Sequence, residues 1–174
     1  MKPIFALLLL SLLSACAIHR GHEPPGSVDD AAEKVAVLAA MDRYMTAISA
    51  KDYATMIAMN MPNSMTWSAR PGKDGKVEPV PRPNNFWTDP ANQNSNAHRE
   101  RYWSPTVLMR GPLAVVWAPY EFWVNGKTSH CGVDVFDFVK VEGKWRVANA
   151  MWTVEAAACE SLRPNDGAQI RPVD

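Results

Sequence analysis

His130 and Asp134 are the side chains in the C-terminal half of the chain whose types best suit acid–base chemistry. Imidazole changes charge near neutral pH, and a buried carboxyl group holds its proton to a higher pH than a solvated one. The two residues are four positions apart in a segment of strand-like alternation, about 13 Å along a strand, so they cannot form a direct dyad. Both could instead make purely structural hydrogen bonds, because buried polar groups need partners in any fold.

Two turn signals, Asn125-Gly126 and Glu142-Gly143, predict which strand residues face each other. A two-residue turn at the first position places Glu121 opposite His130, where the carboxylate could orient the imidazole of a base. A two-residue turn at the second position places Asp134 opposite Met151.

This register gathers polar and aromatic side chains on one face of the predicted sheet. A mostly apolar surface with a few polar groups is typical of a small-molecule pocket, so we expect this face to point inward. The opposite, more uniformly apolar face would then be covered by a second copy of the chain. A single β-bulge would exchange the two faces. The expected site comprises Asp134 and His130 as candidate catalytic residues, with Trp117, Glu121, Phe136, Asn149, Met151 and Thr153 lining the pocket.

Helices are predicted in the first part of the chain and strands in the last. Apolar residues recur every three or four positions over residues 28–50, and a shorter helix is expected at 53–59. A short strand is expected at 65–67, and the proline-rich region 71–105 is expected to be a long loop, with a solvated charge cluster at 98–101. The predicted strands that follow are 106–109, 113–124, 129–141 and 144–154.

The stretch GPLAVVWAPYEFWVNGKTSHCGVDVF, from Gly111 to Phe136, followed by GKWRV from Gly143 to Val147, resembles the nuclear transport factor 2-like superfamily. Its relatives include ketosteroid isomerases and SnoaL-like cyclases, and the resemblance spans about residues 28–155, in an exported bacterial branch of mostly unassigned function. It implies an α+β, cone-shaped fold with N-terminal helices packed on a strongly curved antiparallel sheet. The superfamily hosts enzymes, ligand binders and scaffolds, so the fold alone does not select a function.

The N-terminus is typical of an export signal. Lys2 precedes an apolar run that is too short to span a bilayer, and the run ends in Leu13-Ser14-Ala15-Cys16, which resembles a bacterial lipobox. Ordinary signal cleavage is the alternative. The prediction is a signal peptide at 1–15, a tether at 16–26, the folded domain at 27–160 and a flexible tail at 161–174. Lipidated Cys16 would hold the protein at the cell envelope, facing the periplasm, on the outer membrane if the source is Gram-negative.

The composition and the motifs of the chain exclude several classes of partner and cofactor. Lys and Arg total 18 and so do Asp and Glu, so there is no broad basic surface for nucleic acid. Phosphate-loop, zinc and serine-hydrolase motifs are absent, so no metal or cofactor is expected. Lipidation of Cys16 would leave Cys131 and Cys159 as two thiols in an oxidising compartment, which predicts a disulfide between them.

The sequence thus predicts an envelope lipoprotein whose domain binds a small apolar ligand without transforming it. The alternatives are a cofactor-independent isomerase or dehydratase of ketosteroid-isomerase type, with Asp134 or His130 as its base, and a dimeric interaction module.

Overall fold

The computed structural model describes residues 28–83, 86–164 and 167–173. The predicted signal peptide, the tether and the lipidation site Cys16 lie outside these residues. Helix α1 spans Val28–Ala50 and α2 spans Tyr53–Met59, close to the predicted limits. Asp52 begins α2, because its carboxylate accepts a hydrogen bond from the backbone N–H of Thr55 at 3.0 Å. Among the described residues, no helix combines the length and apolar character that crossing a bilayer requires.

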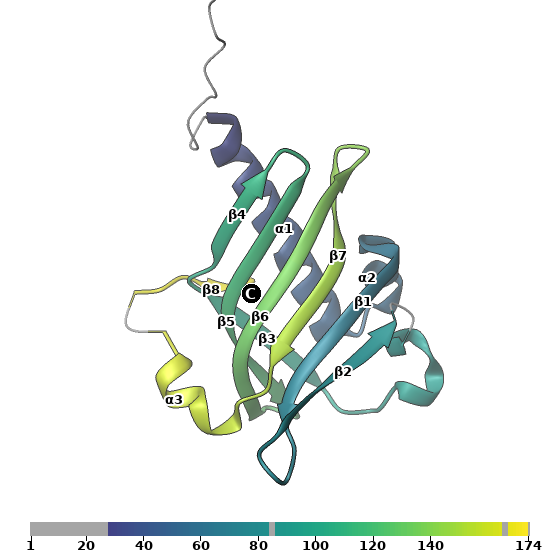
Figure 1. Cartoon of the computed structure of the whole chain (residues 1–174), viewed down its shortest axis with the longest axis vertical. Coiled ribbons are helices and arrows are strands. Elements are labelled where there is room, and N and C mark those ends of the chain that lie inside the picture. Colours follow the sequence, from purple (N-terminus) through teal and green to yellow (C-terminus); the bar gives the residue numbers. More distant parts are fainter. Residues whose placement is uncertain (1–27, 84–85, 165–166, 174) are drawn as a thin grey trace, which may run out of the picture.

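A curved, unclosed sheet lies against α1 (Figure 1). Its strand order is β2-β1-β7-β6-β5-β3-β8, with β4 paired to the first half of β5. The pairing of β1 with β7 is parallel and the others are antiparallel, so the sheet is mixed where a purely antiparallel one was expected. The strands are β1 (Asn60–Pro71), β2 (Val77–Pro83), β3 (His98–Trp103), β4 (Thr106–Arg110), β5 (Leu113–Val124), β6 (Lys127–Val141), β7 (Lys144–Thr153) and β8 (Ile170–Arg171).

The region predicted as a long loop contains the end of β1 and all of β2 and β3, so that prediction was wrong. The alternate prolines of β2 argued against a strand in the sequence, because proline cannot donate a hydrogen bond to a neighbouring strand. They are tolerated because β2 is the edge strand, where a missing N–H matters little. Two short 3₁₀ turns, η1 (Phe86–Thr88) and η2 (Pro90–Asn92), connect the region to β3.

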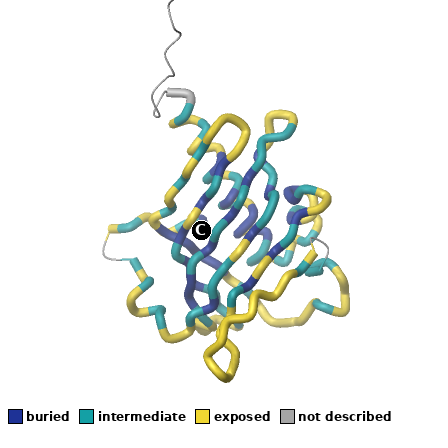
Figure 2. The backbone as a smooth tube through the Cα atoms, in the orientation of Figure 1, coloured by how far each residue is buried: buried dark blue, intermediate teal, exposed yellow. Residues whose placement is uncertain are grey.

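The sheet has an inner face, which packs on α1, and an outer face, which looks away from it. Val37, Met41 and Met45 of α1 are fully buried against inner-face residues of the sheet, in the core that Figure 2 shows in dark blue. The ring of Tyr44 meets that of Phe136 edge-on, with centroids 5.5 Å apart. This apolar contact holds the helix against the middle strands.

Two bulges set which residues reach the inner face. The pairing of β5 with β6 shifts by one residue at Ser129, so Glu121 lies opposite Cys131 and Phe122 lies opposite His130. The pairing of β6 with β7 shifts between Asp137 and Phe138. Each shift exchanges the faces of one strand relative to its neighbour, which is why the predicted register was wrong.

The C-terminal segment returns to the domain. It runs through η3 (Ala156–Ala158) and α3 (Cys159–Leu162) to β8, which pairs with β3. The guanidinium of Arg171 binds the carboxylate of Asp42 at 2.6 Å and Nε donates to the Tyr102 hydroxyl oxygen at 3.1 Å. A fraying tail was expected here; an ion pair to α1 holds this part of it in place.

Candidate functional site

Two buried carboxyl groups occupy the inner face. Asp134 on β6 is 3% exposed and Glu100 on β3 is 8% exposed. Burial raises the pKa of Glu100 to about 8. Burial, and then the charge of Glu100, raise the pKa of Asp134 well above its usual range. At its raised pKa Glu100 keeps its proton at neutral pH, and the raised pKa of Asp134 favours its protonated form. A protonated carboxyl group can donate a hydrogen bond.

Asp134 has an unsatisfied oxygen. Its Oδ2 is buried and has no hydrogen-bond partner among the residues described. Such atoms are uncommon in folded proteins, and each calls for an explanation such as a catalytic role, a bound water or a ligand. Asp134 is therefore the centre of the candidate site.

Aromatic hydroxyl groups surround the two acids. The Tyr120 hydroxyl donates to the backbone oxygen of Thr153 at 2.7 Å, and burial, followed by the charges of Asp134 and Glu100, raises the pKa of Tyr120. Burial also raises the pKa of Tyr44 to about 12. The close approach of Tyr120 depends on Gly132, where a Cβ would lie 2.8 Å from the tyrosine ring and 2.3 Å from the Thr153 oxygen.

His130 lies on the same inner face, half-buried between aromatic rings. Its centroid is 5.4 Å from that of Phe122 and 5.7 Å from that of Tyr120. Burial, and then the charge of Arg70, lower the pKa of His130, which keeps the imidazole neutral at pH 7. Its Nδ1 lies 3.1 Å from the Ser129 hydroxyl oxygen.

The structure brings Asp134, His130 and Phe136 to the inner face, as expected, but not the other predicted residues. Glu121 forms an ion pair with Arg163 of the segment after α3, with a hydrogen bond of 2.9 Å from Arg163 Nε, and does not orient His130. Trp117 and Met151 are exposed on the outer face, at 44% and 43%.

The two remaining predicted pocket residues make structural bonds elsewhere. Asn149 Oδ1 accepts from the Met65 N–H at 3.4 Å, which joins β7 to β1. The Thr153 hydroxyl accepts from the Val133 N–H at 3.0 Å and donates to Glu155. The bulges explain both placements, because they turn the odd-numbered residues of this part of β7 to the outer face and the even-numbered ones to the inner face.

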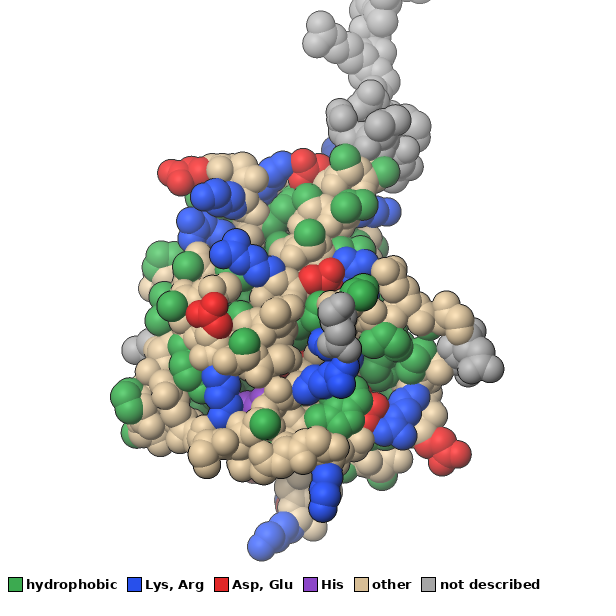
Figure 3. All heavy atoms as spheres, turned by 180° about the vertical axis from the view of Figure 1, so that it is seen from behind, with side chains coloured by type: hydrophobic (Ala, Val, Ile, Leu, Met, Phe, Trp, Pro, Cys, Tyr) green, Lys and Arg blue, Asp and Glu red, His purple; other side chains and the backbone are tan. Residues whose placement is uncertain are grey.

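Glu100 was missed because residues 98–101 were predicted to be a solvated loop. They form β3, whose inward side chains include Glu100 and Tyr102, and the Glu100 N–H donates to the Ser49 hydroxyl of α1 at 3.1 Å. The alternation His98, Glu100, Tyr102 is a strand pattern that could have revealed this. In Figure 3, which views the molecule from the side opposite to Figure 1, a histidine is visible among basic and apolar side chains.

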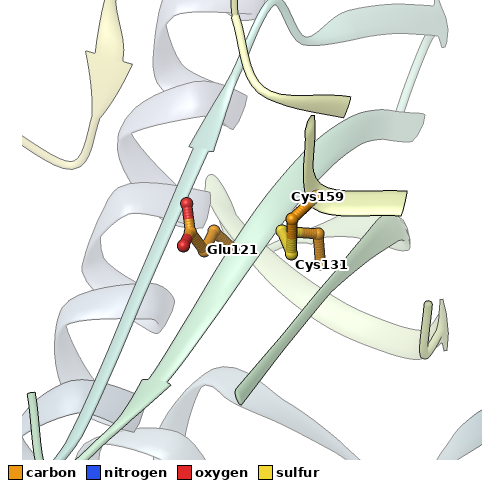
Figure 4. A group of neighbouring side chains, drawn as sticks. All are labelled: Glu121, Cys131 and Cys159. Carbon is orange, nitrogen blue, oxygen red and sulfur yellow. A yellow bond between two sulfur atoms is a disulfide. The ribbon is translucent and has the colours of Figure 1, made fainter. Parts of the chain in front are cut away.

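Glu121, Cys131 and Cys159 form a cluster of three groups of the kinds that bind metals (Figure 4). Cys131 and Cys159 are joined in a disulfide, as predicted, with Cα atoms 5.0 Å apart. A disulfide removes the thiolates that a metal would need, and Glu121 is bonded to Arg163. This cluster is therefore a structural clamp between β6 and α3.

The outer face carries a shallow apolar depression of about 430 Å³. It lies over the strands β1, β7, β6 and β5 that face the viewer in Figure 1. Its lining includes Trp67, Pro79, Trp117, Val133, Val135 and Met151. The apolar face predicted to be covered by a second copy is divided between the two sides of the sheet. Its β6 residues Val133 and Val135 line this depression, whereas its β5 residues lie under α1 in the core.

Comparison with known proteins identifies the fold. No protein-family model and no curated protein matches the chain. Among solved structures, a nuclear transport factor 2-like superfamily protein from Salmonella enterica serovar Typhimurium is similar at 17% identity and a TM-score of 0.56, over 79% of this chain and 96% of that one. A nuclear transport factor 2-like protein of unknown function from Pseudomonas putida is similar at 16% identity and a TM-score of 0.57, over 71% and 87%.

A third similar structure is described as the beta subunit of an aromatic-ring-hydroxylating dioxygenase from Novosphingobium aromaticivorans. Its identity is 12% and its TM-score 0.60, over 74% of this chain and 92% of that one. At these identities the likeness concerns the fold and not the chemistry of the site. This chain shares its fold, helices packed on a curved and unclosed sheet, with these solved structures. The chain therefore has the fold of the nuclear transport factor 2-like superfamily.

Proposed function

We propose that the domain binds a small, largely apolar ligand that bears a carbonyl or a similar hydrogen-bond acceptor, and does not transform it. The observation that carries this proposal is the buried Oδ2 of Asp134, which has no partner among the residues described. A carboxyl group that keeps its proton is a hydrogen-bond donor, and a ligand carbonyl is a suitable acceptor for it. The aromatic residues around the two acids supply apolar contact.

Binding is favoured over catalysis because the acid and the base are too far apart. Proton abstraction next to a carbonyl needs a base at the proton and a donor at the oxygen, and these are neighbouring groups of one substrate. Asp134 and His130 are four residues apart on β6, about 13 Å at the usual rise of a strand. In addition, the raised pKa of Asp134 favours the protonated carboxyl group, which suits a hydrogen-bond donor better than the predicted base.

An isomerase of ketosteroid-isomerase type is the second candidate, favoured by one observation. His130 is neutral and shares the inner face with two acids that can donate hydrogen bonds. The test is hydrogen–deuterium exchange at the methyl group of 2-acetylnaphthalene, followed by NMR in deuterated buffer. Exchange above the buffer rate that His130→Gln abolishes would replace the binding proposal with this one.

Binding is tested with two probes that differ in one group, 2-acetylnaphthalene and 2-ethylnaphthalene, by titration calorimetry. The ketone should bind more tightly, and Asp134→Asn should retain it, because an amide also donates a hydrogen bond. Asp134→Leu should weaken ketone binding about tenfold, the value of one hydrogen bond, and leave 2-ethylnaphthalene unaffected. Failure of both probes to bind, or equal binding of both to the parent and to Asp134→Leu, would contradict the proposal.

The proposal includes a place of action. The sequence from Leu13 to Cys16 supports a lipid-anchored protein of the cell envelope that faces the periplasm. There the domain would hold its ligand close to the membrane.

A further inference from the structure

Arg82 of β2 is held in a fixed position at the edge of the inner face. Its guanidinium carbon lies 5.3 Å from the ring centroids of both Phe86 and Trp87 and 6.0 Å from that of Trp152. Its Nη1 donates to the Ser68 hydroxyl oxygen at 2.9 Å. Nη1 also donates to the Val80 carbonyl oxygen at 3.5 Å. Three aromatic rings and two hydrogen bonds therefore orient the guanidinium before any ligand binds, which lowers the entropic cost of binding an anion there.

Arg82 and its neighbour Arg70 are two positive charges close together. Among the described residues neither forms an ion pair with a carboxylate. Glu78 lies opposite Arg70 in the β1–β2 register but is not bonded to it. Burial, and then the charge of Arg70, lower the pKa of Arg82, so the two like charges destabilise each other. Arg70 acts on His130 in the same direction. An anion at this point would relieve the repulsion.

Arg82 lies at a distance from Asp134 that one small ligand could span. Asp134, Trp152 and Ser68 lie opposite one another on the adjacent strands β6, β7 and β1. Two strand spacings separate Asp134 from Ser68, to which Arg82 is bonded, which is about 10 Å. The half-buried Trp152 lies between the two groups. A flat apolar ligand could lie on this indole with one end at each group.

We infer that Arg82 and Arg70 bind the anionic head group of an organic acid whose apolar body lies over Trp152 and whose far end reaches Asp134. This inference rests on the proposed function and adds to it the ligand's charge and orientation. The ligand class is an aromatic or aliphatic acid with a hydrogen-bond acceptor at the opposite end. Arg is suited to the role because its planar donors match the two oxygens of a carboxylate.

The experiment compares 6-acetyl-2-naphthoic acid with 2-acetylnaphthalene by titration calorimetry on the folded domain. The two probes share the ketone and the ring system and differ in the carboxylate alone. The acid should bind the parent at least about tenfold more tightly, and the difference should shrink with added salt. Arg82→Met should remove the preference, and Arg70→Met, at an exposed position, should reduce it.

Arg110→Met, which removes an arginine from β4, is the matched control and should leave both dissociation constants unchanged. Equal binding of the two probes to the parent would overturn the inference and leave the proposed function standing. So would an acid preference that survives both Arg82→Met and Arg70→Met. Failure of both probes to bind would refute the proposed function, and the inference would fail with it. If Arg82→Met unfolds, which circular dichroism detects, the Arg70→Met result decides.

Discussion

Glu100 and Asp134 interact across an intervening strand. Glu100 is on β3 and Asp134 on β6, with β5 between them, yet the charge of Glu100 contributes to the raised pKa of Asp134. Two buried carboxyl groups that interact in this way cannot both ionise easily, so the pair loses its protons one at a time. The carboxyl groups of the inner face therefore keep protons at a pH where a solvated pair of acids, above about pH 6, would have lost them.

The first prediction concerns stability against pH. Glu100 has a pKa of about 8 in the folded chain, against an ordinary value of 4.5. Between those values the folded state binds more protons than the unfolded state, so the free energy of unfolding falls as pH rises. His98 and His130 have lowered pKa values and act in the opposite direction, but only below about pH 6.5. We expect the parent to lose stability between pH 6.5 and 8, by at most about 1.4 kcal/mol per pH unit for each such proton.

Urea unfolding at several pH values measures this slope. Glu100→Gln should make it shallower, because the amide does not titrate. Glu121→Gln is the control: Arg163 and Thr128 lower the pKa of Glu121, so its carboxylate is ionised in both states above pH 6.5 and its loss should shift stability without changing the slope. An unchanged slope in Glu100→Gln would show that this carboxyl group is not protonated.

The second prediction concerns the disulfide. Cys131 and Cys159 are 28 positions apart, and a closed loop of that length stabilises a fold by about 3.6 kcal/mol in the loop-entropy model. Cys159→Ala should lower the free energy of unfolding by about that amount, and reduction of the parent should reproduce the loss. Cys159 is the better site to change, because replacing the fully buried Cys131 by alanine would leave a cavity. Alkylation of both cysteines in freshly purified, unreduced protein, seen by intact mass, would contradict the bond.

Much of the fold could be predicted from patterns that local chemistry controls. The apolar spacing of α1 and the glycine turns at Gly126 and Gly143, where φ is positive, follow from side-chain periodicity and backbone sterics. The disulfide was predicted from a count of thiols. In the structure Cys131 lies opposite Glu155, a few residues before Cys159.

The site could be predicted only in part, because its geometry depends on single residues that the periodicity does not reveal. An extra residue at Ser129 was enough to exchange the faces of β5, which moved Trp117 and Glu121 to the outside. His130 and Asp134 kept the expected face because both are on β6. Glu100 was missed because its neighbours are charged, and long-range pairing with β5 overrides that local signal.

The third prediction is lipidation of Cys16. A thiol directly after Leu-Ser-Ala is expected to be acylated after cleavage of the preceding segment, and two or more acyl chains hold a protein stably on a bilayer. Cys16→Ser should move the protein from the membrane fraction to the soluble periplasmic fraction. Cys159→Ser, which also removes one thiol, should remain in the membrane fraction. Membrane association of Cys16→Ser equal to that of the parent would show that Cys16 is not the anchor.

The fourth prediction is a homodimer formed through the outer face. Trp67, Trp117 and Met151 are 38%, 44% and 43% exposed there and border one apolar depression. Monomeric proteins seldom leave large contiguous apolar patches in water, and a two-fold contact covers the same patch on both copies with one interface. Trp117→Glu would place two carboxylates in that interface, so it should convert the dimer to a monomer.

Light scattering coupled to size-exclusion chromatography measures the mass directly, across a range of concentrations. Val35→Glu is the matched control, because Val35 is an apolar residue 68% exposed on α1, on the other side of the sheet from the depression. The Val35→Glu variant should remain a dimer, since the charge would lie outside the contact. A parent that is monomeric at every concentration, or a Trp117→Glu variant that stays dimeric, would exclude the outer face as the interface. If Trp117→Glu alone is monomeric while its probe-binding constants match the parent's, the two faces of the sheet have separate roles: the outer face joins copies and the inner face holds the ligand.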